Sequence, residues 1–143
     1  MLNIFPALRE LWVRELGWWS KDKWRDLLAA RGLRKLTLHS CYNLPGERLA
    51  DLARLPELEE LHFDHCLGFD DDDFAGLAGI TTLRRLTLRY CDKYSVKSTF
   101  KGLLRLSGLP LESLDIGGAC HFRGWSGKRW RDVCRAFPGT AIE

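Results

Sequence analysis

The sequence of 143 residues contains no long hydrophobic run. A membrane-spanning helix needs about 20 consecutive apolar residues, so no transmembrane segment and no membrane partner are expected. The first residues, MLNIFPALRELWV, also lack the basic start, the apolar stretch and the small-residue cleavage site of a secretory signal. We therefore expect a cytoplasmic protein.

An excess of charge of one sign is also nearly absent. The net charge is only +3, and acidic and basic residues are interspersed along the chain. Nucleic-acid-binding proteins usually carry a strongly basic face, so no nucleic-acid partner is expected. The one basic cluster, RGWSGKRWRD (Arg123–Asp132), is interpreted as a solvated helix face.

The motifs that usually carry chemistry are missing as well. The sequence has no C-x-x-C pair of the kind found in zinc sites and no glycine-rich phosphate loop. The run DDDD (Asp70–Asp73) is not followed by the glycine of a calcium loop and is interpreted as a helix cap. We expect no enzyme, no cofactor and no bound metal ion.

The five cysteines do not form a disulfide framework, because their number is odd and three of them share one position of a repeat. Cys41, Cys66 and Cys91 lie 25 residues apart, each at the end of a short apolar and polar alternation. A buried free cysteine behaves as a small hydrophobic residue. We expect all five to be structural thiols, Cys120 and Cys134 included.

A repeat of 25 residues organises the chain. Runs of the form L-x-x-L-x-φ, where φ is apolar, predict strands that start near Leu8, Leu33, Leu58 and Leu83, and a fifth follows 28 residues later at Leu111. Between the runs, apolar residues recur at the spacing of a short helix with one buried stripe. These residues are Trp24, Leu27 and Ala30, then Leu49, Leu52 and Leu55, then Phe74, Leu77 and Ile80.

This pattern resembles leucine-rich repeats, and among them the cysteine-containing subfamily. The segment CLGFDDDDFAGLAGITTLRRLTLRYC (Cys66–Cys91) follows that unit almost position for position. Leu16 and Ala119 depart from it at cysteine positions. The resemblance implies an α/β solenoid of about five repeats plus a partial one, with a curved parallel sheet on the concave face and short helices on the convex face.

The chain is expected to form a single domain over residues 1–143. The segment 126–143 echoes the start of the second repeat and predicts a terminal helix followed by an edge strand. Tryptophans are concentrated in 12–24 and 125–130, where bulky side chains can cover the ends of the core. Whether the freer ones, Trp12 and Trp18, contact a partner or pack against the ends is left open.

Residues at the outward positions of the strands and turns are the candidate binding site. They are varied, charged and aromatic, and they include three of the four histidines. The expected partner-binding residues are Trp12, Arg14, Glu15, Lys35, His39, Glu60, His62, Asp64, His65, Arg85, Arg89, Tyr90 and Asp115.

Three interpretations of this face stay open. One is a polar surface that docks a protein partner, the second is a pH-sensitive contact through its histidines, and the third is a metal or acid–base site at His39, His62, Asp64 and His65. The first is favoured, because a shallow sheet lacks the enclosed pocket that catalysis usually needs.

We therefore expect a non-enzymatic protein-binding module, a monomer or one subunit of a hetero-complex. Its concave face and aromatic ends would contact a protein partner, in the role of a cytosolic inhibitor, an immunity protein or an adaptor. The resemblance also implies substrate recognition in ubiquitin ligases, and bacterial effectors carry similar repeats. A structural subunit of a larger assembly is a further alternative.

Overall fold

A computed structural model describes residues 7–15, 20–41, 49–66, 70–91, 100–117 and 126–143. Its strands are β1 (Glu10–Arg14), β2 (Lys35–His39), β3 (Glu60–Asp64), β4 (Arg85–Arg89), β5 (Ser113–Asp115) and β6 (Ala141–Ile142). Its helical segments are α1 (Lys21–Ala29), η2 (Ala50–Arg54), α3 (Asp71–Leu77), α4 (Phe100–Leu104), η3 (Arg105–Gly108) and α5 (Gly127–Ala136), where η denotes a 3₁₀ helix.

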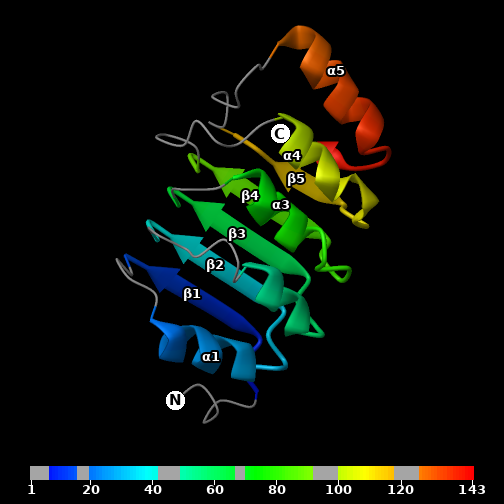
Figure 1. The fold of residues 1–143 in the computed structure, drawn as a ribbon. Coiled ribbons are helices and arrows are strands. Elements are labelled where there is room, and N and C mark those ends of the chain that lie inside the picture. Colours follow the sequence, from blue (N-terminus) through cyan, green and yellow to red (C-terminus); the bar gives the residue numbers. More distant parts are fainter. Residues whose placement is uncertain (1–6, 16–19, 42–48, 67–69, 92–99, 118–125) are drawn as a thin grey trace.

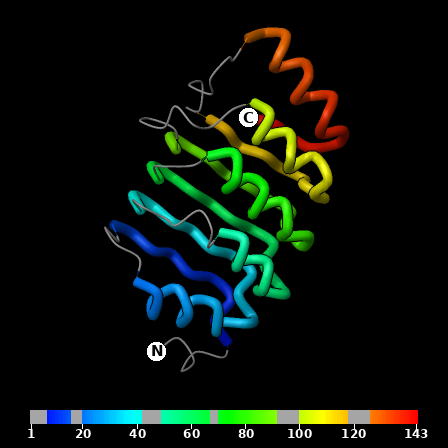
Figure 2. Tube along the Cα trace, viewed as in Figure 1, coloured from blue at the N-terminus to red at the C-terminus, as the bar shows by residue number. Residues whose placement is uncertain are grey.

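The strands form one parallel sheet in the order β1-β2-β3-β4-β5-β6, so each strand pairs with its neighbours in the chain. The helical segments follow one another along one side of this sheet (Figures 1 and 2). The α/β class expected from the sequence is confirmed. Each of the first five strands begins two residues after the leucine that opens its repeated run.

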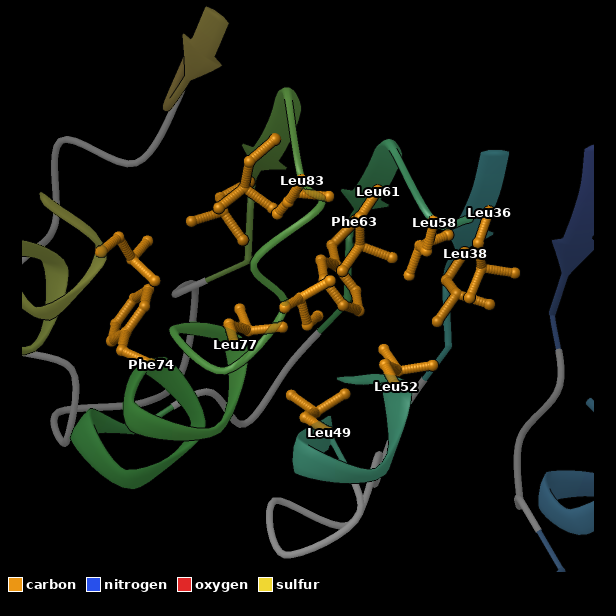
Figure 3. Close-up of a cluster of buried hydrophobic side chains, with 14 of the residues drawn as sticks. Leu36, Leu38, Leu49, Leu52, Leu58, Leu61, Phe63, Phe74, Leu77 and Leu83 are labelled. Carbon is orange, nitrogen blue, oxygen red and sulfur yellow. The ribbon is translucent and has the colours of Figure 1, made fainter. Parts of the chain in front are cut away.

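The core lies between the sheet and the helical segments. In β2 and β3 every second side chain is buried, and Leu61 and Phe63 of β3 are 0% exposed. Figure 3 shows these side chains directed toward Leu49 and Leu52 on one side and toward Phe74 and Leu77 on the other. The three predicted sets of apolar helix residues, which start at Trp24, Leu49 and Phe74, are all buried. This confirms the helical spacing.

The helical segments differ in type although their apolar spacing is the same. α3 begins with a capping box, in which the Asp70 carboxylate accepts the Asp73 backbone N–H and the Asp73 carboxylate accepts that of Asp70. The interpretation of the aspartate run as a cap is therefore confirmed. The second segment, η2, has no side-chain cap and winds as a 3₁₀ helix, the tighter form common in short pieces.

The last described segment holds α5 and β6, the helix and edge strand predicted for 126–143. Val133 and Phe137 bury one stripe of α5. Cys134 is exposed, so the prediction of a structural thiol at that position is wrong. It lies one residue beyond Val133, which turns its side chain about 100° around the helix and away from the core.

The other described cysteines occupy the turns after the strands. Cys41, Cys66 and Cys91 are buried, as predicted. The Cys66 thiol donates to the Leu38 carbonyl at 3.1 Å, and contact with Cys41 together with burial raises its pKa, so it stays neutral. The Cys91 thiol likewise donates to the Phe63 carbonyl in the preceding strand, so both thiols link a turn to the strand before it.

The residue just before each cysteine position adopts an unusual backbone. Glu15, Ser40, His65 and Tyr90 have φ between 51° and 55°, in the left-handed region that favours glycine. Because the same conformation recurs after four strands, it belongs to the turn itself.

No helix in the described ranges is long and apolar enough to cross a membrane.

Candidate functional site on the open face of the sheet

We call the side of the sheet opposite the helical segments the open face. It comprises the alternate strand side chains that do not enter the core, together with the turn residues that follow the strands. All thirteen predicted site residues lie within the described ranges. Glu15, His65 and Tyr90 follow the strands, and the strand register arranges the other ten, with their neighbours, in three rows. The rows are Glu10, Lys35, Glu60, Arg85 and Ser113; then Trp12, Thr37, His62, Thr87 and Asp115; then Arg14, His39, Asp64 and Arg89.

The first row is a chain of ion pairs centred on Glu60. Its carboxylate lies 3.7 Å from Lys35 Nζ and accepts a hydrogen bond from Arg85, whose guanidinium also lies 3.5 Å from Glu112. Burial raises the pKa of Glu60, but hydrogen bonds with His62 and Arg85 outweigh burial and the net pKa is lowered. Glu60 is therefore ionised, and it links β3 to Lys35 on β2 and Arg85 on β4.

His62 belongs to this network. Its Nδ1 lies 2.9 Å from Thr87 Oγ1, and its Nε2 lies 3.4 Å from Glu60 Oε2. Burial lowers its pKa more than Glu60 raises it, so the ring is neutral near pH 7. Its nitrogens face Thr87 and Glu60, and His62 is not part of the group of ligand atoms formed by His39, Asp64 and His65.

The remaining three members of that predicted site do come together at the carboxyl ends of β2 and β3. His65 Nδ1 lies 2.7 Å from Asp64 Oδ1, and His39 Nε2 lies 3.7 Å from Asp64 Oδ2. The His39 and His65 rings are 5.6 Å apart between centroids. We call His39, Asp64 and His65 the histidine–aspartate cluster.

Arg89 and Asp115 form a separate pair at one edge of this cluster. Arg89 Nη2 lies 2.6 Å from Asp115 Oδ2, and this contact raises the pKa of Arg89. The other Asp115 oxygen accepts the Gly117 backbone N–H. Asp115 is only 8% exposed, and its role in this structure is to hold the Arg89 guanidinium. Its part in partner binding stays a prediction.

Exposed aromatic residues stand at two places on the open face. Trp12 is 62% exposed and lines a shallow depression of about 420 Å³ with Glu10, Leu11, Lys35 and Thr37. Tyr90 is 48% exposed and stacks on His65, with ring centroids 4.6 Å apart. Of the other tryptophans, Trp24 is buried and Trp130 is partly exposed on α5. Trp18, Trp19 and Trp125 lie outside the described residues, as does Cys120.

Three supporting residues of the open face were not among the predicted site residues. Ser40 contacts His39 Nδ1 at 3.0 Å. Thr87 hydrogen-bonds His62, and Glu112 pairs with Arg85. The strand alternation already places Thr87 outward. Glu112 directly precedes β5, and no sequence signal marks it.

A second hollow lies on the helical side, between α1 and η2. It has a volume of about 530 Å³ and is lined by Trp24 and Leu28 together with Lys21, Arg25, Arg31, Arg54, Asp51 and Ala29. Its cations come from α1, from Arg31 just after it and from η2. The hollow therefore adds basic surface to the helical side.

Comparisons with known proteins add no assignment. No protein-family model matches the chain, and no curated protein matches it. The residues of the open face are therefore the basis for the function proposed below.

Proposed function

We propose that this chain is a leucine-rich-repeat solenoid that acts as a non-enzymatic docking module and binds a protein partner in the cytoplasm through the open face of its sheet. Support for the repeat family comes from the 25-residue spacing of strands, buried leucines and turn cysteines. Repeat architectures of this kind use the extended face of their sheet as a binding surface.

The observation that carries the proposal is the exposure of Trp12 and Tyr90 on a face whose charged side chains are already paired with one another. Large aromatic residues contribute most of the binding energy in many protein interfaces. Here they stand in solvent beside ordered polar neighbours, where a partner can bury them.

The polar pairs support docking in a second way. Binding costs free energy when mobile side chains become ordered. Lys35, Glu60 and Arg85 are already linked across three strands, and Arg89 is held by Asp115. The surface is therefore partly organised before any partner arrives, so less side-chain ordering remains to be done on binding.

A partner of matching chemistry offers apolar or aromatic groups for Trp12 and Tyr90 and hydrogen-bond acceptors for the outer edges of Arg85 and Arg89. An inhibitor, an immunity protein or an adaptor fits this description, because each works by occupying a surface of its target. None of these roles needs a catalytic group.

The test begins by immobilising the chain and identifying what it retains from an extract of its native source. The partner is then purified, and its affinity is measured for the wild-type chain and for Trp12→Ala and Tyr90→Ala. We expect each variant to weaken binding by about tenfold or more, since truncating a central aromatic residue typically costs 1.4 kcal/mol or more.

Trp130→Ala is the matched control, because Trp130 is also a partly exposed tryptophan but lies on α5. Its affinity should stay near that of the wild type. If Trp130→Ala abolishes binding while Trp12→Ala and Tyr90→Ala bind normally, the interface lies on the helical side and the proposal is wrong.

A further inference from the structure

The histidine–aspartate cluster brings metal-ligating atoms from three side chains into one small volume. One ligand atom each from His39, Asp64 and His65 can be chosen so that all three lie within 4.8 Å of one another. His39 and Asp64 are partners in the register of β2 and β3, and His65 follows Asp64 directly. The convergence is therefore fixed by strand pairing.

The Asp64 carboxylate faces the two imidazoles, and the arginines on either side of the cluster are paired with other acidic residues. Arg89 is the register partner of Asp64, but its guanidinium is bound to Asp115 at 2.6 Å. On the other side, Arg14 is the register partner of His39, and its Nε lies 3.1 Å from Glu15. Each flanking cation has an acidic partner of its own.

Neighbouring side chains also orient the two rings. Ser40 Oγ lies 3.0 Å from His39 Nδ1, so the nitrogen of His39 that faces Asp64 is Nε2. Tyr90 stacks on His65 at an angle of 30° between the rings. In metal sites, the second nitrogen of a histidine ligand is usually held by a hydrogen bond, as Ser40 holds Nδ1 of His39 here.

We propose that His39, Asp64 and His65 bind a divalent transition-metal ion, with zinc the metal best suited to the donor set. Two imidazoles and one carboxylate are a common set of three protein ligands for zinc, and the fourth position stays open to solvent. Imidazole nitrogen does not suit calcium or magnesium, which prefer oxygen ligands. This site goes beyond the docking function, and the sequence alone led us to expect no bound metal.

The distances require only side-chain adjustment. Ligand atoms in a tetrahedral zinc site lie about 3.3 Å apart, given bonds of about 2.0 Å. The contact of 2.7 Å between His65 Nδ1 and Asp64 Oδ1 would open slightly as the ion replaces the shared proton. His39 would move toward the ion by rotation of its ring, since the backbone positions are set by the strand pairing.

His62 provides a matched control on the same face. It is one of the four histidines of the chain, it lies on β3 two residues before Asp64, and it is as accessible as His39. Its nitrogens are engaged by Thr87 and Glu60. A site made by the cluster needs His39 and His65 and does not need His62.

The experiment titrates the purified chain with Zn²⁺ by calorimetry, without any partner protein, so its outcome is independent of the docking proposal. His39→Ala, Asp64→Asn and His65→Ala are compared with His62→Ala. The same titrations are repeated in a Cys120→Ser/Cys134→Ser background, because an exposed thiol such as that of Cys134 can itself compete for zinc. Circular dichroism confirms that each variant is folded.

We expect one Zn²⁺ per chain in the wild type and in the serine background. Each cluster variant should lose at least about tenfold in affinity, Ser40→Ala should lose about tenfold, and His62→Ala should change by less than about twofold. The proposal is overturned if no stoichiometric binding occurs, if the cluster variants bind like the wild type, or if His62→Ala weakens binding as much as they do.

A second readout needs no substitution and covers the case in which a variant does not fold. In NMR spectra of the imidazole nitrogens of the wild-type chain, Zn²⁺ should shift the His39 and His65 signals and leave those of His62 unchanged. A shift of His62 alone, or of no histidine, would contradict the site.

Discussion

The two faces of β3 are held by different forces although their residues alternate along the same five positions. Leu61 and Phe63 are completely buried and packed against the helical side. Glu60, His62 and Asp64 are part-exposed and are held by hydrogen bonds and ion pairs. Glu60 and His62 contact side chains of neighbouring strands, and Asp64 contacts His39 on β2 and His65 in the turn after β3. The buried face depends on volume and the open face depends on directed polar contacts.

This difference separates stability from binding. A packed core is sensitive to a change in side-chain volume as small as one methyl group. Substitutions on the buried face therefore change the stability of the whole fold. Directed contacts near solvent each contribute little, so the open face can change its residues while the strand stays in place. The predictions below test how far that separation holds.

The largest expected effect comes from Phe63→Ala. Removing a fully buried phenylalanine side chain costs about 3–5 kcal/mol of unfolding free energy, because apolar contacts are lost and a cavity remains. His62→Ala, one residue away on the open face, should cost about 1 kcal/mol. Urea denaturation followed by circular dichroism measures both, and equal losses would contradict the separation of the two faces.

The second prediction contrasts a buried acid with an acid of the open face. Burial raises the pKa of Asp73, in the capping box of α3, to about 6. In the unfolded chain this carboxyl ionises near pH 3.9. The protonated form is thus favoured by folding, so the stabilisation is fully present below about pH 4 and is lost as the pH rises through 6.

The free energy of unfolding should therefore fall by up to about 3 kcal/mol between pH 4 and pH 7 through Asp73. Asp73→Asn keeps an oxygen that can accept the Asp70 N–H, and it should remove this fall. Asp64→Asn on the open face is the control and should leave the fall in place. A wild-type fall that persists in Asp73→Asn would show that another group causes it.

The third prediction concerns two arginines in the same row of the open face. Arg89→Ala leaves the buried carboxylate of Asp115 without its cation and should cost about 1–3 kcal/mol. Arg14→Ala breaks only an exposed pair with Glu15 and should cost less than about 0.5 kcal/mol. Thermal unfolding of both variants measures the difference, and an equal effect would mean that the burial of Asp115 has no energetic consequence.

The smallest effect is expected at Glu15, whose φ of 55° is unfavourable for any residue with a Cβ atom. Glu15→Gly should be more stable than Glu15→Ala by about 1 kcal/mol, because only glycine adopts this conformation without strain. Comparing these two variants removes the effect of losing the carboxylate. If alanine is the more stable of the two, the turn is not strained in solution.

The sequence predicted the buried face well and the open face only in outline. Leucines every 25 residues and a period of two within each strand determine which side chains enter the core, because packing tolerates few alternatives. The capping role of Asp70 followed from its place before an apolar helical stripe.

The contacts on the open face could not be predicted, since alternation gives the side of the sheet but not the direction of a side chain. His62 looked like a member of one cluster with His39 and His65, but its hydrogen bonds join it to Thr87 and Glu60. Asp115 occupies an outward position by alternation, and the pairing with Arg89 accompanies its burial. The 3₁₀ winding of η2 likewise has no signal in the apolar spacing.

Each of two turn cysteines forms a hydrogen bond with the strand that precedes its own strand, and this affects how the number of repeats could change. The thiol of Cys66 bonds to the carbonyl of Leu38, and that of Cys91 bonds to the carbonyl of Phe63, each in the strand before. Sheet pairing also joins only consecutive strands. Removing residues 59–83 would bring Arg84 directly after Leu58 and present β4 to β2 with the same kinds of contact. We therefore expect the fold to accept the gain or loss of one 25-residue unit, whereas loss of a single residue inside a strand would turn the following side chains to the wrong face.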